Sequence, residues 1–403
     1  MQMRYDMLTW MSCTLLFLGV LACGGEDTTG SFAPPVASEP ETLGAEMLRS
    51  IEEPVLRVKR FVSDSFHVDR KWGSMQGPVD VQRLSLGEFA RPEILWVRGY
   101  RASVVPADGI GHVSQEFMCH NNLDFSAANH ARIFEWKGDW ARHAAVRDRV
   151  FTISQGQFDV VLPDGFGFPI RSDEPLHLTT QVLNHNIDAP DVHVRHEIEI
   201  TYSRDRDLET PLKPLFQHGI FVMASLDETS AYFGIEEPNE TQEGSSCALG
   251  EHADVELGVF MDELGRRFTG HWIVEPGRET RRTLVTRQLN LESDARIHFI
   301  GVHLHPFAET LELRDLSTGE SLWTAHARGP DGETGLSEVD YYASEEGIPL
   351  FKDHEYELVS VYDNDSGVKQ DAMATMFLYL DDPDAAASIE YQRRLRSWAS
   401  EAD

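Results

Sequence analysis

The sequence predicts an all-β protein made of two tandem antiparallel β-sandwiches and one short C-terminal helix. From about residue 55 to residue 380, apolar or alternating runs of five to eight residues follow one another, separated by Gly, Pro, Asn and Asp. Runs such as FDVVLPDGFGFP, HEIEITYSRD and AMATMFLYL have the alternation of strands, and their close spacing is typical of sandwiches. About 355 residues follow the N-terminal segment, which is more than one core usually organises, so two domains are expected.

The boundary between these domains is expected in the charged, Pro-containing stretch SRDRDLETPLKPLF. It gives an N-terminal sandwich over residues 48–208 and a C-terminal sandwich over residues 209–383. Residues 384–403 form the predicted helix, which has an Asp cap and an Ala-rich start and is expected to pack on the second domain. Its apolar residues recur at i, i+4 and i+7 as Tyr391, Leu395 and Trp398.

The N-terminus predicts export and lipid anchoring. In residues 1–22, Arg4 precedes an apolar segment that is too short to span a bilayer, as in a signal peptide. The letters VLA directly before Cys23 resemble the lipobox of bacterial lipoproteins, so Cys23 is the expected lipidation site. Residues 23–47 are interpreted as a flexible tether. The expected location is the bacterial cell envelope, facing the periplasm or the outer surface; the alternative is an ordinary signal peptide with an unused cysteine.

The charge of the chain excludes one class of partner. Lys+Arg 35 against Asp+Glu 67 gives a formal net charge of -32, and such a surface repels nucleic acid and anionic lipid headgroups. Contact with the membrane is therefore expected through the N-terminal lipid only. The sequence has no G-x-S-x-G elbow and no carboxylate pair with a distinctive spacing, so it does not favour a hydrolase.

Two of the four cysteines keep an unmodified thiol after processing. Cys13 leaves with the signal and Cys23 carries the lipid, so Cys119 and Cys247 meet an oxidising compartment and are a candidate disulfide. That bond closes a long loop and could stabilise the fold by roughly 4 to 5 kcal/mol. Cys119 could instead act as a soft metal ligand, and the two roles exclude each other.

The run IHFIGVHLHPF places His303 and His305 two positions apart, on one face of a strand. Two such imidazoles either hold a metal or form a polar face that meets water. Downstream, alternation puts Met373 on one face of the strand DAMATMFLYL and Met376 on the other, which we expect to be the core face. A thioether prefers Cu(I), and two imidazoles with one weak thioether leave positions on copper where a gas or substrate can bind.

VHLHPF, followed about seventy residues later by a turn and DAMATMF, resembles the C-terminal domain of the copper type II ascorbate-dependent monooxygenases. This is the family of peptidylglycine α-hydroxylating monooxygenase and dopamine β-monooxygenase. The segment WIVEPGRETRR is also similar, and the resemblance covers roughly residues 215 to 380. It implies a jelly-roll fold and a catalytic copper held by His303, His305 and Met373. It also implies hydroxylation of an activated C–H bond of a small organic or peptide substrate, with O2 and a reductant such as ascorbate.

The N-terminal half resembles the same family less completely. The segment DGFGFPIRSDEPLHLTTQVLNHN maps a copper-binding histidine onto His185, and FMCHNNLDF corresponds to a double-His segment of which only His120 remains. The resemblance therefore implies one or two copper ions. Three alternatives stay open: the first site is lost; it is rebuilt with Cys119, His112 or His177; or Asn121 supplies a weak third donor.

Two function hypotheses follow. The first is a copper-dependent monooxygenase. The second is a non-catalytic copper-binding or scaffold lipoprotein of the cell envelope. The two-jelly-roll architecture also occurs in bacterial glycoamidases that use no copper, so the fold by itself does not decide between them.

Overall fold

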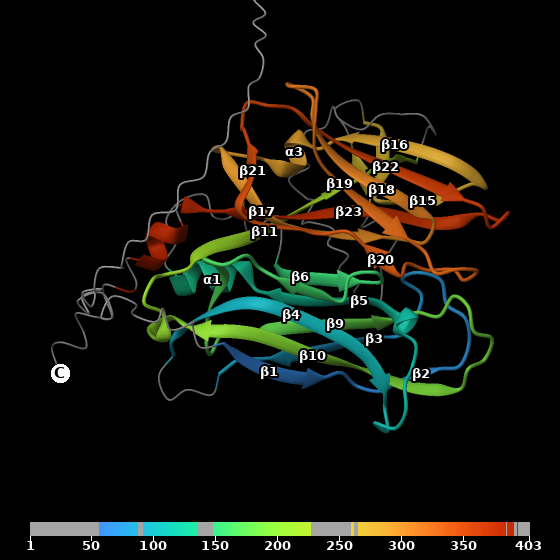
Figure 1. The fold of residues 1–403 in the computed structure, drawn as a ribbon, viewed down its shortest axis with the longest axis horizontal. Coiled ribbons are helices and arrows are strands. Elements are labelled where there is room, and N and C mark those ends of the chain that lie inside the picture. The colour runs from blue at the N-terminus through green and yellow to red at the C-terminus, as the bar shows by residue number, and fades with distance from the viewer. Residues whose placement is uncertain are drawn as a thin grey trace, which may run out of the picture. The chain divides into compact units, whose positions relative to one another are not determined.

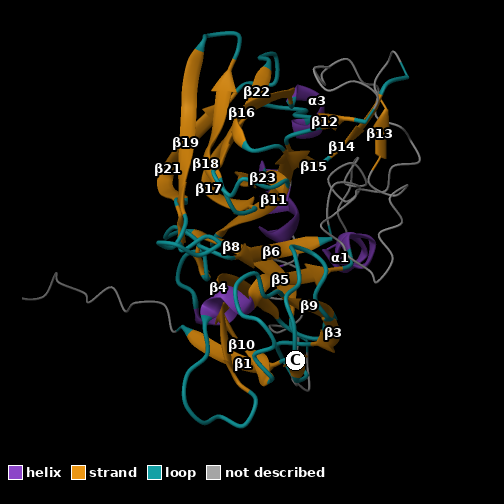
Figure 2. Ribbon diagram, turned by 90° about the vertical axis from the view of Figure 1, so that its right-hand side faces the viewer, coloured by secondary structure: helices purple, strands orange, loops and turns teal. Residues whose placement is uncertain are grey.

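The protein is described here from a computed structural model, which covers residues 56–87, 92–134, 148–226, 259–261, 265–383, 385–390 and 393. These residues belong to one compact unit, Glu53–Asp403. They form β-sheets with little helix, which confirms the predicted all-β sandwich class with a short C-terminal helix (Figures 1 and 2). The signal peptide, the tether, Cys23 and Cys247 lie outside the described residues. In the part that is described, no helix is long and apolar enough to cross a membrane.

Within the described residues, the N-terminal half contains ten strands and three short helices. The strands are β1 (Arg57–Val62), β2 (Phe66–Val68), β3 (Val79–Leu84), β4 (Ile94–Pro106), β5 (Met118–Phe125), β6 (Arg149–Ser154), β7 (Asp159–Val161), β8 (Phe166–Arg171), β9 (Leu176–Val182) and β10 (Val192–Arg204). The helices are η1 (Gln115–Phe117), α1 (Ala127–Phe134) and η2 (Asp205–Asp207).

The C-terminal half continues with strands and one helical turn, α3 (Thr286–Leu289). Its strands are β11 (Lys213–Phe221), β12 (Ala224–Ser225), β13 (Val259–Met261), β14 (Arg267–Thr269), β15 (His271–Val274), β16 (Gly277–Leu284), β17 (Ala295–Leu304), β18 (Ala308–Asp315), β19 (Glu320–Arg328), β20 (Glu338–Val339), β21 (Tyr342–Leu350), β22 (Tyr356–Asn364) and β23 (Gln370–Asp381).

The strands form two pairs of packed sheets, and in Figure 1 the N-terminal strands β1, β10 and β4 lie below the C-terminal strands β11, β17 and β23. A sheet containing β1, β10, β4 and β8 covers the four-stranded sheet β3-β9-β5-β6. In the C-terminal half, β11, β23, β17 and β21, with β15 beside β23, pack against the five-stranded sheet β16-β22-β18-β19-β20. Most pairs are antiparallel, but a short parallel pair between β8 and β11 joins the two halves into one sheet. The edge strand β6 of the four-stranded sheet lies against β11 and β17 at the junction of the two halves.

Alternate side chains along β23 are buried in different apolar clusters. Met376 is fully buried in the apolar cluster of the C-terminal half, together with Leu378 on the same face. Phe377 and Tyr379 point the other way and join the cluster of the N-terminal half. The Tyr379 hydroxyl donates a hydrogen bond to the Val150 carbonyl of β6 at 3.0 Å. The opposite face of β23 thus lines the junction of the two halves, and the core role predicted for Met376 is confirmed.

The C-terminal helix packs differently from the prediction. Its described part begins at residue 383 and covers 385–390, and the Asp382 carboxylate accepts the Ala385 N–H at 2.9 Å as an N-cap. Ile389 is buried against Ile94 and Trp96 of β4, so the helix rests on the N-terminal half rather than on the second domain. Arg393 confirms this placement, because it donates to Asp205 at 2.8 Å. The predicted contacts of Tyr391, Leu395 and Trp398 lie outside the described residues.

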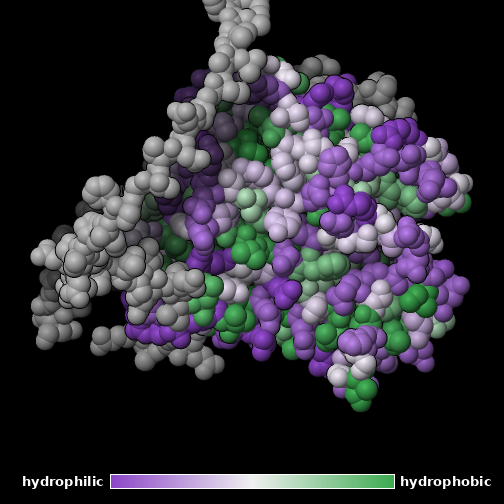
Figure 3. Space-filling view, viewed as in Figure 1, coloured by the Kyte–Doolittle hydropathy of each residue, from purple (hydrophilic) through white to green (hydrophobic). Residues whose placement is uncertain are grey.

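Polar and apolar residues are interspersed on the face that Figure 3 shows, as the acidic composition leads one to expect. The domain boundaries predicted at residues 208 and 383 stay predictions. Strand β11, which follows the first of them, contributes residues to the apolar clusters of both halves, so the clusters do not mark a boundary there.

Candidate metal centre

A tight turn ends β17 directly after the two histidines. The His305 carbonyl accepts the Ala308 N–H at 3.4 Å, and Phe307 has a φ of 69°. Proline at the second position and a positive φ at the third are typical of a type II turn. A bulky residue in that conformation is strained by about 1 to 3 kcal/mol, and such strain often marks a functional site. Pro306 therefore turns the chain away at the point where His305 faces the junction.

The sheet register places Met373 between two histidines. His303 pairs with Thr375, and the His305 N–H donates to the Met373 carbonyl at 3.3 Å, which continues the β17–β23 ladder by one step. On the other side of β23, His271 pairs directly with Met373. Directly opposed residues share a sheet face with their Cβ atoms about 5 Å apart. His271, Met373 and His305 therefore form one row, and His303 lies in the next row.

The imidazole rings stand at distances that suit a shared ion. The ring centroids of His303 and His305 are 5.3 Å apart at an interplanar angle of 90°, and those of His271 and His305 are 5.6 Å apart. Two imidazoles that bind one metal at about 2 Å have centroids roughly 5 to 6 Å apart. As described, no three His, Cys, Asp or Glu side chains already surround one point. Binding therefore requires rotations about χ1 and χ2 that bring the nitrogens together.

Buried nitrogens without partners supply the test of fit. His120 and His303 are 1 % and 3 % exposed, and neither ring nitrogen of either residue has a hydrogen-bond partner among the described residues. Leaving a buried polar group unpaired costs about 1 to 3 kcal/mol, so such groups need an explanation. Two unpaired imidazoles beside a methionine fit a copper ion, because neutral imidazole and thioether are ligands that copper accepts.

The electrostatics keep the buried rings neutral. Burial, together with the smaller effect of the positive charge of Arg149, lowers the pKa of His120 to about 3. Burial also lowers the pKa of His303 well below its usual value, with a smaller contribution from His305. Neutral imidazole is the form that binds metal, so these rings are available as ligands at neutral pH.

Asp371 and His185 lie on the open side of the same cluster. Asp371 Oδ2 is 2.9 Å from His305 Nδ1, without the angle of a hydrogen bond, and Asp371 Oδ1 is 3.8 Å from His271 Nδ1. Burial opposes ionisation of Asp371, but its contacts with these two rings hold its pKa far below the usual range. His185 is half-buried, and burial lowers its pKa to about 4, with His305 adding to the effect.

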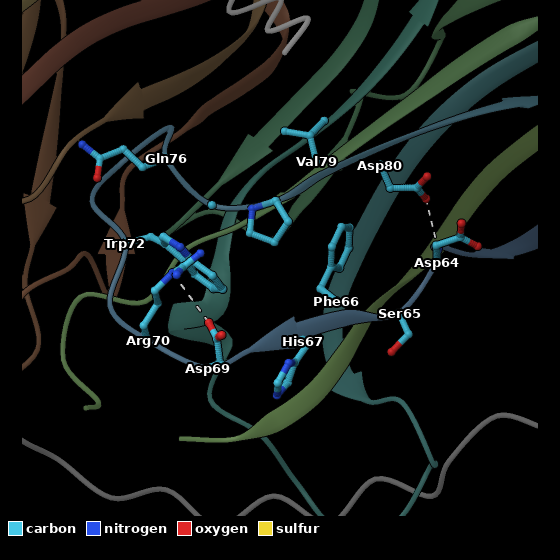
Figure 4. Close-up of a pocket in the computed structure, with 12 residues that line it drawn as sticks. Asp64, Ser65, Phe66, His67, Asp69, Arg70, Trp72, Gln76, Val79 and Asp80 are labelled. Atoms are coloured by element: carbon cyan, nitrogen blue, oxygen red, sulfur yellow. Dashed lines mark hydrogen bonds and ion pairs between the residues drawn. The ribbon is translucent and has the colours of Figure 1, made fainter. Parts of the chain in front are cut away.

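A pocket of about 290 Å³ opens beside this cluster, at His185 and Asp371. Residues from both halves line it, including Trp72 and His185 from the N-terminal half and Asp371 from the C-terminal half. A larger pocket of about 620 Å³ lies between β2 and β3, with Phe66, His67 and Asp80 among its lining residues (Figure 4). The larger pocket contains none of the clustered histidines, so we regard the smaller one as the access route.

A tyrosine fixes the backbone of the centre from behind. The Tyr362 hydroxyl donates to the Met373 carbonyl at 2.6 Å, and the His305 N–H lies 3.4 Å from the same hydroxyl. The ring packs edge-on against Trp272 at a centroid distance of 5.6 Å. Tyr362 therefore holds the ends of β17 and β23 in register where the candidate ligands stand.

The N-terminal candidates do not form a separate cluster. His120 lies on β5, where its ring faces His303 with centroids 6.4 Å apart, and no contact joins it to His185 in the described residues. Asn121 points to the opposite face, where it accepts from the Tyr100 hydroxyl and its amide is 3.0 Å from His196 Nδ1. The alternative with Asn121 as a third donor therefore finds no support.

The remaining alternatives for the first site concern three residues. His112 is exposed in the loop after β4, and His177 pairs with Asp124 near the far end of β5. Cys119 is buried with its sulfur 3.9 Å from that of Met75, and its predicted disulfide partner lies outside the described residues. Neither His112 nor His177 has a described contact with His120.

Sequence reasoning missed His271 and Asp371. Asp371 had a usable signal, because it stands two positions before Met373 and so shares its face of the strand. His271 had none, since only the pairing of β15 with β23 brings it beside Met373.

Comparison with protein-family models finds no match for this chain, and comparison with curated proteins finds none. Among solved structures, PNGase F, a glycosylasparaginase from Flavobacterium meningosepticum, is 7% identical over 81% of this chain and 96% of its own, with a TM-score of 0.31. The major capsid protein P2 of bacteriophage PM2 is 10% identical over 80% of this chain and 97% of its own, with a TM-score of 0.28. Likenesses this weak carry no argument about function.

Proposed function

We propose that the protein is a copper-dependent monooxygenase whose copper is held by His303, His305 and Met373. The observation that supports this most directly is the pair of buried imidazoles at the end of β17, with ring centroids 5.3 Å apart, next to a methionine on β23. Core histidines normally have hydrogen-bond partners, and His303 has none among the described residues. The resemblance of VHLHPF and DAMATMF to the copper monooxygenases agrees with this donor set.

Each residue has a definite part in this proposal. His303 and His305 supply neutral nitrogen ligands, and the Met373 thioether favours the reduced ion. Asp371 Oδ2 lies 2.9 Å from Nδ1 of His305 and orients that ring, as carboxylates next to metal-binding histidines commonly do. The packed strands around the centre exclude water, while the pocket at His185 admits a substrate.

Copper bound by this donor set supplies one-electron chemistry with dioxygen. The proposed reaction hydroxylates an activated C–H bond of a small organic or peptide substrate, with a reductant such as ascorbate. With lipid on Cys23, the enzyme would work at the cell envelope.

The two methionines of β23 provide a matched test. Met373→Leu and Met376→Leu make the same chemical change on opposite faces of one strand. We expect Met373→Leu to lower Cu(I) affinity at least tenfold and to abolish ascorbate-dependent oxygen uptake, whereas Met376→Leu keeps both because the swap conserves core volume. Cu(I) competition titrations and an oxygen electrode measure the two effects. Equal behaviour of the two variants contradicts the proposal.

A second candidate function is copper binding without turnover. Its support is the depth of the site, since His303 and Met373 are each only 3 % exposed and an ion there would be shielded from large substrates. The same titrations distinguish the two functions: a binding protein takes up copper through Met373 but shows no oxygen uptake that depends on it.

A further inference from the structure

The contact between His120 and His303 joins two sheets that are distant in sequence. His120 comes from β5 of the N-terminal half and His303 from β17 of the C-terminal half, and their rings meet edge-on at 80° with centroids 6.4 Å apart. Both side chains are almost completely buried. Here β5 and β17 bring polar rings, rather than apolar side chains, against each other.

An ordinary structural role does not account for this pair. A neutral imidazole carries one donor and one acceptor, and buried histidines usually satisfy at least one of them. On β10, the buried His196 does so through Asn121. His120 and His303 leave all four nitrogens unpaired among the described residues, although Gln181, Ser154 and other polar groups lie on neighbouring strands.

Among the described residues, neither Asn121 nor His185 of the N-terminal half stands beside His120 as a second ligand. The Asn121 amide is bound on the opposite face of β5, and His185 stands at the pocket, nearer to Asp371 and His305. A separate copper ion on His120 would therefore lack partners in its own half.

We propose that His120 completes the copper centre of His303, His305 and Met373 from the opposite half, so that one ion joins the two halves. This inference rests on the proposed copper site. The centroid distance of 6.4 Å between His120 and His303 lies slightly beyond the roughly 5 to 6 Å of two imidazoles on one ion, so binding requires a small rotation of one ring. The chain then holds one copper ion, and that ion cross-links β5 to β17.

The test uses the full chain with Cu(I) and three variants. His120→Leu and His303→Leu each replace one imidazole with an apolar side chain of similar size. His177→Leu changes a half-buried histidine at the far end of the same sheet and serves as the control. Copper per chain, Cu(I) affinity, the number of imidazole ligands by X-ray absorption and the copper-induced rise in Tm are measured for each protein, together with the double variant of His120 and His303.

We expect one copper per chain. His120→Leu should lower the affinity at least tenfold, remove one imidazole from the absorption spectrum and abolish most of the copper-induced rise in Tm. The loss in the double variant should be smaller than the product of the two single losses, because both ligands serve one ion. His177→Leu should match the wild-type chain. Without copper, His120→Leu should melt no lower than wild type, because it removes two unpaired nitrogens.

Three results overturn the inference. If His120→Leu keeps the copper stoichiometry, affinity and ligand number while His303→Leu loses them, the copper site stands but His120 is no part of it. If wild type binds two ions and each variant loses a different one, the centres are separate. If neither wild type nor variants bind Cu(I), the proposed copper function fails together with this inference.

Discussion

Tyr362 gives a prediction that tests how the backbone supports the centre. Tyr362→Phe removes one oxygen atom, and the buried ring stays against Trp272. The lost hydroxyl donates to the Met373 carbonyl at 2.6 Å and lies 3.4 Å from the His305 N–H, but these two groups also bond each other at 3.3 Å. Because the carbonyl keeps one partner, the free energy of unfolding should fall by only about 1 kcal/mol.

Copper affinity should fall by more than this stability loss implies. The hydroxyl lies behind the residues that position His305 and Met373, and removing a group that orients metal ligands typically weakens binding by about 10- to 100-fold. Tyr356→Phe is the matched control, since Tyr356 lies on the same strand, is equally buried and both donates to and accepts from the Phe351 backbone, at 3.0 and 2.6 Å. That variant should lose similar stability and no copper affinity.

Urea unfolding of the metal-free proteins and Cu(I) competition titrations measure the two quantities separately. The reasoning is refuted if Tyr362→Phe binds copper as tightly as wild type, or if Tyr356→Phe weakens binding to the same extent. The first result shows that the register of β17 and β23 does not depend on the hydroxyl; the second shows that any loss of stability in this sheet disturbs the centre.

Two further predictions concern stability away from the centre. Burial lowers the pKa of His196 from 6.5 to about 3, so the folded state resists a protonation that the unfolded chain accepts. The stability that the neutral His196 ring contributes is therefore complete above pH 6.5 and is lost as the pH falls, by about 2 kcal/mol at pH 5. His196→Gln should therefore lose about 2 kcal/mol less than wild type between pH 7 and pH 5 in urea unfolding, and parallel pH curves for the two proteins would show the argument to be wrong. Ile389→Ala should cost about 2 to 4 kcal/mol, because it opens a cavity against Ile94 and Trp96, and an unchanged urea midpoint would mean that the C-terminal helix is not docked on β4.

Local alternation allowed a large part of the site to be predicted from sequence. His303 and His305 share a face because strand side chains repeat every two residues, and the same rule separated Met373 from the core residue Met376. Pro306 marked the end of the strand, and the turn observed there follows from its fixed φ. These features depend on neighbours in the chain, so they can be read without the fold.

The sequence by itself thus determined the sandwich class, the paired histidines and the face of each methionine. Only the tertiary structure decided that His271 lies beside Met373, that Asn121 faces away, and that His120 meets His303. The helix at residues 385–390 likewise found its partner in β4, far away in the sequence. The reason is physical: alternation fixes which face a side chain takes, whereas strand register and the stacking of layers fix which distant face it meets.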